Sequence, residues 1–255
     1  MQFIDTHCHI HLSDYKLDAD SVVKDAVKAG VSKLVCVGCT IEDSKLGIEF
    51  AEHHENAWAS IGLHPHEAKN YIGNNELLNE FSELVKSPKV VAIGECGLDY
   101  YYMHSSKEEQ KQLLRFQMEL AVKANLPLIF HIRDSFDDFW PIFDDFNGLR
   151  GVVHSFSANR QVLTDALSRG LYVGLNGIMT FTKDPGQLEA AKVVPLDRLL
   201  LETDAPFLTP TPYRGTICQP KHVVVTAEFL ADLRNEQIED IASSTTHNAQ
   251  KLFNI

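Results

Sequence analysis

The feature that most constrains the fold is a regular alternation of short β-rich runs with longer amphipathic stretches along the 255 residues. Eight runs are predicted to be strands: Phe3–His9, Lys33–Gly38, Trp58–His64, Val90–Gly97, Pro127–Arg133, Gly151–Phe156, Tyr172–Gly177 and Leu199–Ala205. Helical patterns are predicted at Asp18–Ala29, Ile41–Glu55, Asn74–Lys86, Ser106–Ala124, Ser135–Phe146, Asn159–Ser168, Gln187–Val194, Pro220–Leu233 and Glu236–Phe253. Alternating strands and helices form parallel βαβ units, and eight such units predict an α/β protein with a (β/α)8 TIM-type barrel.

The alternative to a closed barrel is a doubly wound open sheet. Such a sheet normally carries a glycine-rich phosphate loop after its first strand, and this chain has His7-Cys8-His9 at that place. No linker or low-complexity tract interrupts the alternation, so residues 1–255 are predicted to form a single domain.

Composition limits the classes of function. The net charge is -12 and the basic residues are scattered, which argues against a broad duplex-binding face. A substrate held by its end in a metal-lined pocket remains compatible with this charge. No apolar run approaches the roughly 18 residues of a membrane helix, and the first residues lack the pattern of a secretory leader. We expect a cytoplasmic protein without a membrane segment, and no obligate protein partner is indicated.

Metal-capable side chains stand at the carboxyl ends of five predicted strands. Alternate residues of a strand share a face, so the two histidines of the first strand point the same way. Imidazoles and carboxylates at the ends of apolar runs are costly to bury without partners. The carboxyl ends of all barrel strands meet on one face, so the set predicts a divalent-metal site. The residues are His7, His9, Glu95, His131, His154 and Asp204.

This ligand set also predicts a reaction type. Four imidazoles and two carboxylates suit Zn²⁺, Mn²⁺ or Fe²⁺, and suit Mg²⁺ less well. They are enough for two ions that share one carboxylate, an arrangement that clamps the attacking and leaving oxygens of a displacement. Asp204 is the candidate general base for a metal-activated water. For any single histidine, a core residue with satisfied hydrogen bonds is the alternative.

Two residues near the predicted ligands are candidates for substrate binding. Arg133 lies two positions beyond His131, on the same strand face, and its guanidinium could bind a phosphate; a surface ion pair is the alternative. His64 follows the third strand with inward parity, where it could contact substrate or be a plain loop histidine.

The region around the eighth strand adds two further candidates. Arg214 lies in the loop after that strand, where barrels often bind phosphate. Glu202 shares its parity with Asp204 and could support a ligand or serve as an auxiliary ligand, with a buried structural ion as the alternative. After the fourth strand, the segment Asp99-Tyr100-Tyr101-Tyr102 could stack on a base or simply line the loop.

Six segments carry a resemblance to a known family. They are Phe3–His9, Gly62–His66, Ile93–Tyr100, His131–Asp134, His154–Ser157 and Leu201–Pro206. Together, and in this order through essentially the whole chain, they resemble the TatD family of metal-dependent deoxyribonucleases in the amidohydrolase-like barrel superfamily. The most specific segments are Glu-Cys-Gly-Leu-Asp-Tyr, beginning at Glu95, and Leu-Glu-Thr-Asp-Ala-Pro, beginning at Leu201.

The resemblance implies a role for each matching metal-capable residue. His7 and His9 match ligands of one metal ion. Glu95 matches the bridging ligand and is therefore expected to be essential for catalysis. His131 and His154 match ligands of the other ion.

The resemblance also implies an activity. Asp204 matches a ligand near the nucleophilic water, which agrees with its selection as candidate base. Family members hydrolyse phosphodiester bonds, and some trim DNA from the 3′ end. We therefore expect a 3′-5′ exodeoxyribonuclease that acts on DNA ends or single-stranded DNA with two divalent ions, which would be Mg²⁺, Mn²⁺ or Zn²⁺.

The sequence departs from the family pattern without losing a ligand. Tyr102-Met103 replaces an arginine that is common after Gly-Leu-Asp-Tyr, and Cys218 stands where asparagine is usual. Both positions lie in loops expected to contact substrate. The alternative function is a small-molecule amidohydrolase or phosphotriesterase-like enzyme, although such relatives often use a carboxylated lysine where this chain has Glu95. A non-catalytic metal-binding protein is disfavoured by the complete ligand set.

Overall fold

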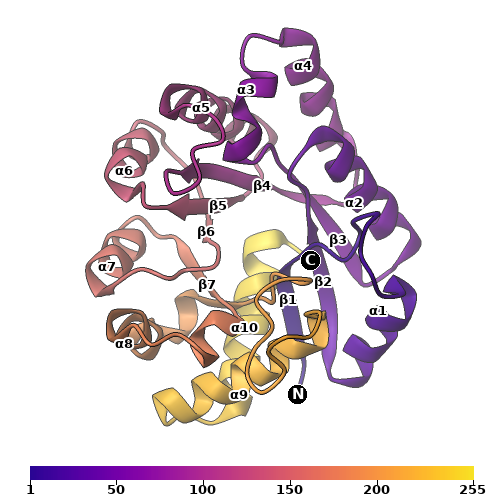
Figure 1. Cartoon of the computed structure of the whole chain (residues 1–255), viewed down its shortest axis with the longest axis vertical. Helices are drawn as coiled ribbons and strands as arrows, with labels where there is room; N and C mark the ends of the chain where they lie inside the picture. Colours follow the sequence, from indigo (N-terminus) through magenta and orange to yellow (C-terminus); the bar gives the residue numbers. More distant parts are fainter. The chain divides into compact units, whose positions relative to one another are not determined.

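The computed structural model describes residues 1–255 and contains eight parallel strands that neighbour one another in sequence order, β1 to β8. Figure 1 labels strands β1 to β7 and the helices α1 to α10. The strands are β1 (Phe3–Cys8), β2 (Val31–Val37), β3 (Ala57–Ile61), β4 (Val90–Asp99), β5 (Leu128–Arg133), β6 (Gly151–Val153), β7 (Tyr172–Leu175) and β8 (Leu199–Leu201). This order confirms the predicted α/β class and its (β/α)8 TIM-type barrel fold.

The helices also follow the predicted alternation. They are α1 (Ala19–Lys28), α2 (Ile41–His53), α3 (Ala68–Tyr71), α4 (Asn75–Glu83), α5 (Lys107–Ala124), α6 (Phe136–Asp144), α7 (Arg160–Ser168), α8 (Pro185–Val193), α9 (Val223–Arg234) and α10 (Ile238–Phe253). Short 3₁₀ turns are η1 (Pro65–Glu67), η2 (Leu84–Lys86), η3 (Gly177–Thr180), η4 (Leu196–Arg198) and η5 (Pro220–His222). N-cap side chains stabilise the first turns of several helices. Ser106 and Glu109, for example, form a complete capping box at the N-terminus of α5. No helix is long and apolar enough to cross a membrane.

The chain divides into two compact units. Unit 1 comprises residues 1–36 and 154–255, and unit 2 comprises residues 37–153. The expectation that residues 1–255 form a single domain stays a prediction.

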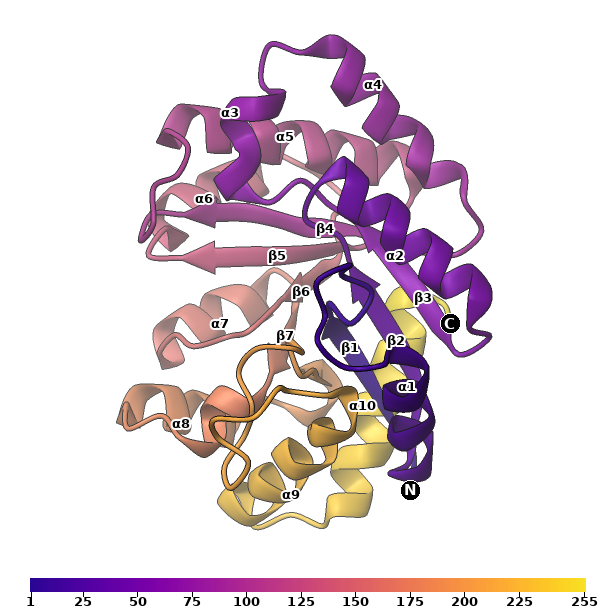
Figure 2. The ribbon, with the colours of Figure 1, turned by 45° about the vertical axis from the view of Figure 1, so that its right-hand side comes forward.

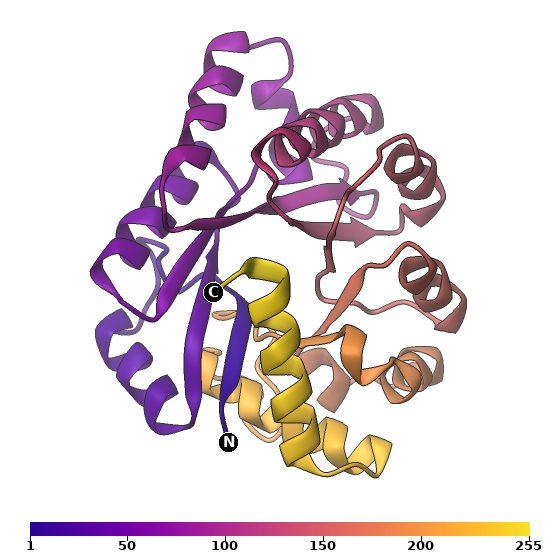
Figure 3. The same ribbon diagram turned by 180° about the vertical axis from the view of Figure 1, so that it is seen from behind.

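In unit 1, the long helix α10 packs against β1 and β8. Figure 3 shows α10 beside the N-terminal strand. Every residue of β1 is buried, and α10 buries Ile241, Thr245, Ala249 and Leu252, which recur at the spacing of one helix face. Because β1 is covered in this way, its C-terminal end is held in a fixed position.

In unit 2, β4 is the central element. All ten of its residues are buried, and it pairs with β3 and with β5. Figure 2 shows β4 and β5 side by side. Helix α5 packs on β4 and buries Leu113, Leu114, Met118 and Ala121. The result is a rigid strand whose last residues carry polar side chains.

Five predicted site residues lie just beyond the observed strands: His9 follows β1, His64 follows β3, His154 follows β6, and Glu202 and Asp204 follow β8. β6 ends at Val153, so His154 follows the strand; the next residue, Ser155, has a left-handed φ of 47°. β8 ends at Leu201, and Asp204, beyond it, has a φ of 60°. Between β3 and α4 the structure also contains η1 and α3, which the sequence reading missed because segments this short have no helical periodicity.

Candidate metal centre

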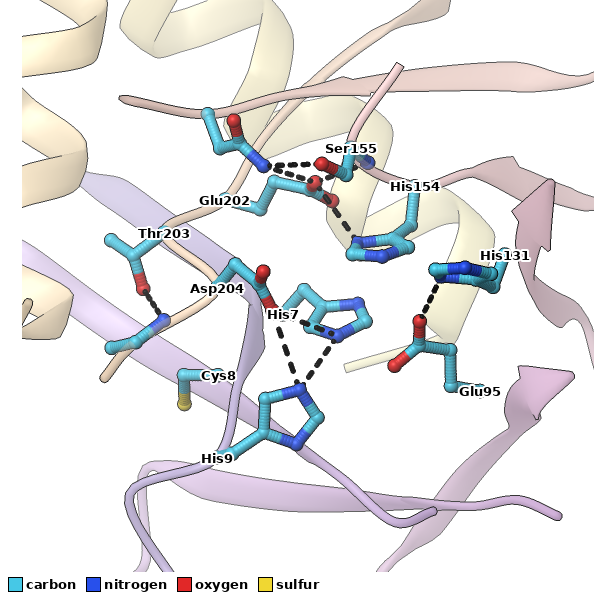
Figure 4. Close-up of polar contacts among 12 residues, drawn as sticks. His7, Cys8, His9, Glu95, His131, His154, Ser155, Glu202, Thr203 and Asp204 are labelled. Carbon is cyan, nitrogen blue, oxygen red and sulfur yellow. Dashed lines mark hydrogen bonds and ion pairs between the residues drawn. The ribbon is translucent and has the colours of Figure 1, made fainter. Parts of the chain in front are cut away.

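The first group of polar residues lies in unit 1 and is called the His7 cluster; its members are His7, His9, His154, Glu202 and Asp204. Figure 4 shows the rings of His7 and His9 turned toward the Asp204 carboxylate. The Nε2 atoms of the two rings are 3.1 Å apart. Asp204 Oδ1 lies 3.6 Å from His7 Nε2 and 3.4 Å from His9 Nε2. Three donor atoms from two segments far apart in the chain therefore converge on one point.

Backbone pairing holds these two segments together beyond the end of β8. Asp204 N donates to the His7 carbonyl at 2.8 Å, and His9 N donates to the Ala205 carbonyl at 2.6 Å. The buried Asp5 carboxylate accepts hydrogen bonds from Thr203 Oγ1 at 2.6 Å and from Thr203 N at 2.9 Å. Burial raises the pKa of Asp5 well above its usual value, although the bonds from Thr203 oppose this. Asp5 was not predicted, yet it fixes the segment that carries Asp204.

His154 is held between a ring and a carboxylate. It stacks on His7 with ring centroids 3.8 Å apart, and its Nδ1 lies 3.2 Å from Glu202 Oε1. Ser155 N donates to the same oxygen at 2.6 Å. A carboxylate on Nδ1 is the usual arrangement around metal-binding histidines, because it leaves Nε2 for the ion. Gly174 makes room for Glu202, since a Cβ there would overlap the carboxylate.

The second group lies in unit 2 and is called the Glu95 cluster; its members are His64, His66, Glu95, Asp99 and His131. His131 Nδ1 is 2.7 Å from Glu95 Oε1, and His131 Nε2 is 3.0 Å from Asp99 Oδ2. His66 Nε2 reaches the same Asp99 oxygen at 3.0 Å, and His64 Nε2 lies 3.7 Å from Glu95 Oε1. His64, Glu95 and His131 each offer one ligand atom within 4.8 Å of the others.

Three members of this neighbourhood were not predicted as site residues. Asp99 shares the strand parity of Glu95, so extending the alternation along β4 would have found it. His66 belongs to η1, where strand parity does not apply. Cys39 is half-buried, and its Sγ donates to Glu95 Oε2 at 3.7 Å. No pattern in the sequence indicates that contact.

The close approach of β4 and β5 positions the Glu95 cluster. Gly97 pairs with His131 across the two strands, and Asp99 pairs with Arg133. Gly97 has a φ of 151°, and a Cβ there would overlap the His131 carbonyl. The buried Gln110 side chain accepts from Asp99 N at 2.8 Å and donates to the Asp99 carbonyl at 3.1 Å. The His131 side of the cluster is therefore positioned by the neighbouring backbone of Gly97, and the Asp99 side by the buried Gln110 side chain.

Burial and neighbouring groups shift the pKa values of three residues in the two clusters, His64, Asp204 and Asp99. Burial and the nearby His131 hold the pKa of His64 well below its usual value, so His64 is a neutral imidazole. Burial alone would raise the pKa of Asp204, but His9 and His7 lower it below its usual value. Burial opposes ionisation of Asp99 as well, yet the hydrogen bond from His131 brings the pKa of Asp99 well below the usual range. Ionised carboxylates and neutral imidazoles are the forms that bind cations.

The predicted substrate contacts have different surroundings. His64 is a member of the Glu95 cluster. Arg133 is exposed, and its guanidinium packs over the rings of Tyr101 and Tyr102 instead of pairing with a carboxylate. Arg214 is exposed as well; it donates to the Thr209 carbonyl and lies over the Phe181 ring. A phosphate contact for Arg214 stays a prediction.

The residues of the His7 cluster fit a divalent cation. Ligands bound at about 2.0 to 2.1 Å around a tetrahedral ion are separated by about 3.3 Å. The three donor atoms of His7, His9 and Asp204 are 3.1 to 3.6 Å apart. In addition, Glu202 Oε2 is buried without a hydrogen-bond partner, and a nearby cation would compensate its charge. Imidazoles combined with carboxylates suit Zn²⁺, Mn²⁺ or Fe²⁺.

Comparison with known proteins agrees with this chemistry. The profile of the family described as TatD related DNase matches residues 4–254. The metal-dependent hydrolase YabD of Bacillus subtilis is 38% identical over 253 residues, which cover 98% of each chain. The 3′-5′ ssDNA/RNA exonuclease TatD of Shigella flexneri is 32% identical over 250 residues and 95% of each chain. The crystal structure of YjjV, a TatD homologue of Escherichia coli, superimposes with a TM-score of 0.92 at 30% identity, over 99% of this chain and 98% of that one. The matched region includes every residue of both clusters.

Proposed function

Because the chain belongs to the TatD family of metal-dependent hydrolases, we propose that it removes nucleotides from the 3′ end of single-stranded DNA. The observation that carries the proposal is the convergence of His7 Nε2, His9 Nε2 and Asp204 Oδ1 within 3.6 Å of one another. Family membership identifies the bond as a phosphodiester, and the name of the TatD relative supplies the 3′-5′ polarity.

Each cluster has a part in the proposed reaction. His7, His9 and Asp204 would hold one divalent ion, and Glu95 and His131 would hold another. An ion at such a site polarises phosphate oxygens and lowers the pKa of water. The sharing of Glu95 between two ions, and the pairing of His131 with His154 on one ion, follow from the family resemblance alone and stay predictions.

Asp204 is the proposed general base. Its Oδ1 faces the two imidazoles, which leaves Oδ2 to accept a proton from the attacking water. His9 and His7 favour the ionised carboxylate, the form a base requires. Glu202 would act indirectly, by holding His154 through Nδ1. His64, neutral and 3.7 Å from Glu95, could donate to or accept from a substrate oxygen.

The direct test uses single-stranded DNA with a fluorophore at its 5′ end. Metal-free protein is loaded with Mg²⁺, Mn²⁺ or Zn²⁺ in turn, and products are separated by length. We expect a ladder that shortens from the 3′ end, is blocked by a 3′-terminal phosphorothioate and disappears with a chelator. His9→Ala and Glu95→Gln should abolish it. His53→Ala, an exposed histidine of α2, is the matched control and should not.

Other outcomes would reassign the activity. Intact DNA together with turnover of a lactam or a phosphotriester would establish the alternative, a small-molecule amidohydrolase or phosphotriesterase-like enzyme. Faster shortening of RNA than of DNA would change the preferred substrate. Measuring bound metal by elemental analysis gives the number of ions, which we predict to be two per chain. A cytoplasmic location and independence from a protein partner stay predictions.

A further inference from the structure

Two exposed tyrosines lie beside the Glu95 cluster. Tyr101 and Tyr102 follow β4, and their side chains are 59% and 52% exposed. With Arg133 they form what is called here the tyrosine platform. Large aromatic side chains that remain exposed near a functional site often mark a binding surface. The adjacent Tyr100 is different, since its hydroxyl donates to Asp138 at 2.7 Å and Lys107 covers its ring.

The platform combines aromatic faces with a cation. The two tyrosine rings meet edge to face with centroids 4.8 Å apart. The Arg133 guanidinium lies 4.0 Å from the Tyr101 centroid and 5.0 Å from that of Tyr102. A guanidinium over aromatic rings still carries five N–H donors, and those that do not face the rings can donate to a phosphate.

The backbone of the loop that carries the two rings is fixed by hydrogen bonds to two side chains, those of Asp99 and Gln110. Asp99 Oδ1 accepts hydrogen bonds from Tyr101 N at 2.9 Å and Tyr102 N at 3.0 Å. Gln110 donates to the Ser105 carbonyl at 3.0 Å and closes the other end of the loop. Ligand binding therefore requires little ordering of this segment, which favours affinity.

A continuous set of contacts connects the platform to a proposed metal ligand. Tyr102 packs against the ring of His66 with centroids 5.5 Å apart. His66 and His131 both bond Asp99 Oδ2 at 3.0 Å, and His131 contacts Glu95. A group stacked on the exposed part of Tyr102 would therefore be separated from Asp99 by one histidine ring, that of His66.

We propose that the tyrosine platform stacks on an unpaired nucleobase next to the scissile phosphodiester, with Arg133 on an adjacent phosphate. The inference rests on the proposed function and specifies which residues hold its single-stranded substrate. Every base has a π face, so stacking tolerates sequence, and bases of an intact duplex are not available for it. The net charge of -12 also favours stacking as a source of affinity, because electrostatic attraction to the phosphate backbone cannot supply much of it.

The test measures binding of a short 5′-fluorescein oligothymidine by fluorescence anisotropy, without turnover, in the presence of a chelator. Removing a base-stacking ring weakens binding about 5- to 100-fold. We expect that loss for Tyr102→Leu, whereas Tyr102→Phe, which keeps the ring, should stay within about twofold. A terminal abasic nucleotide should weaken binding to the unsubstituted protein similarly but add little to the loss in Tyr102→Leu, because the two changes remove one interaction.

Salt dependence gives an independent readout. If Arg133 makes one or two phosphate contacts, the logarithm of the binding constant should fall with the logarithm of salt with a slope of about -0.7 to -1.4. Arg133→Gln should flatten that slope. A steep slope that Arg133→Gln does not change would mean that backbone attraction elsewhere dominates, and would overturn the proposal.

The outcomes separate this inference from the proposed function. If DNA is shortened but Tyr101→Leu and Tyr102→Leu bind it as tightly as the unsubstituted protein, the platform proposal is wrong and the nuclease assignment stands. If no phosphodiester is cleaved but binding still depends on the rings, the nuclease assignment fails and the platform stands as a nucleic-acid site. Sedimentation velocity tests whether the platform binds another copy of the protein. If the unsubstituted protein is an oligomer and Tyr102→Leu is not, while oligonucleotide binding is unchanged, the platform is a protein interface and the proposal is wrong.

Discussion

Replacing Glu202 with alanine should weaken metal binding, because Glu202 holds His154, a proposed ligand, and the change leaves the converging atoms of His7, His9 and Asp204 untouched. Glu202 Oε1 accepts from Ser155 N at 2.6 Å and lies 3.2 Å from His154 Nδ1 and 3.4 Å from Asn176 Nδ2. Removal of a carboxylate that orients a metal-binding histidine lowers affinity about 10- to 100-fold. That corresponds to about 1.4 to 2.7 kcal/mol of binding free energy.

Isothermal titration of metal-free protein with Mn²⁺ or Zn²⁺ measures this effect. Glu202→Gln should lose about tenfold, because it keeps one acceptor oxygen but removes the buried charge at Oε2. Glu189→Ala, an exposed carboxylate of α8 in the same unit, is the matched control and should bind normally. Urea denaturation of the metal-free variants reports the separate loss of folding stability. Unchanged affinity in Glu202→Ala would refute the role of Glu202 in orienting His154.

Four further effects can be measured. Asp5→Ala leaves three buried donors without their acceptor, at about 1 to 3 kcal/mol each, so urea denaturation should show a loss of at least about 3 kcal/mol; less than about 1 kcal/mol would contradict the assigned contacts. Gly97→Ala should weaken metal binding at least about tenfold by displacing His131, whereas Gly148→Ala, also at positive φ but in open space, should affect only stability. Burial lowers the pKa of His222 to about 4, so between about pH 6.5 and 4 the unfolded chain binds this proton and the folded chain does not, and stability falls as pH falls. In His222→Gln, the free energy of unfolding should therefore fall by about 2 to 3 kcal/mol less between pH 7 and pH 4.5 than in the unsubstituted protein. Urea denaturation of both proteins at the two pH values measures this difference. Adding Mn²⁺ to chelator-treated protein at a hundredfold excess over its dissociation constant should stabilise it by about 2.7 kcal/mol, and an unshifted melting temperature would mean that no folded-state site exists.

Sequence periodicity was enough to predict the main elements of the fold. Each strand has an apolar run of its own, and the helices between them have distinct amphipathic patterns, so their number and order could be predicted. The ends of β6 and β8 could not, because Val152-Val153-His154 reads as a continuing strand until the left-handed Ser155 is seen. Helix α3 has four residues, fewer than the two turns over which periodicity becomes visible.

For the site, the sequence predicts which face of a strand a side chain lies on, but not which partners it contacts. Strand alternation predicts which face a side chain joins, and this is why His7 and His9 could be recognised together. It does not predict what the side chain meets there. Asp5 has the parity of His7 but bonds Thr203, and Asp99 has the parity of Glu95 but bonds two histidines. Such partners come from other strands and turns, whose positions only the folded chain reveals.

The pairing of residues 7–9 with residues 204–205 also determines when the His7 cluster can form. Asp5 and Thr203, which bond across this junction, are 198 positions apart. At about 5 to 20 residues per second, a growing chain displays His7 and His9 for about 10 to 40 s before Asp204 has been made. During that interval the Asp204 carboxylate is missing from the set of three converging donor atoms. The three donor atoms can converge only once Asp204 arrives and one of the longest loops in the chain closes, so tight ion binding and completion of unit 1 become a single late event.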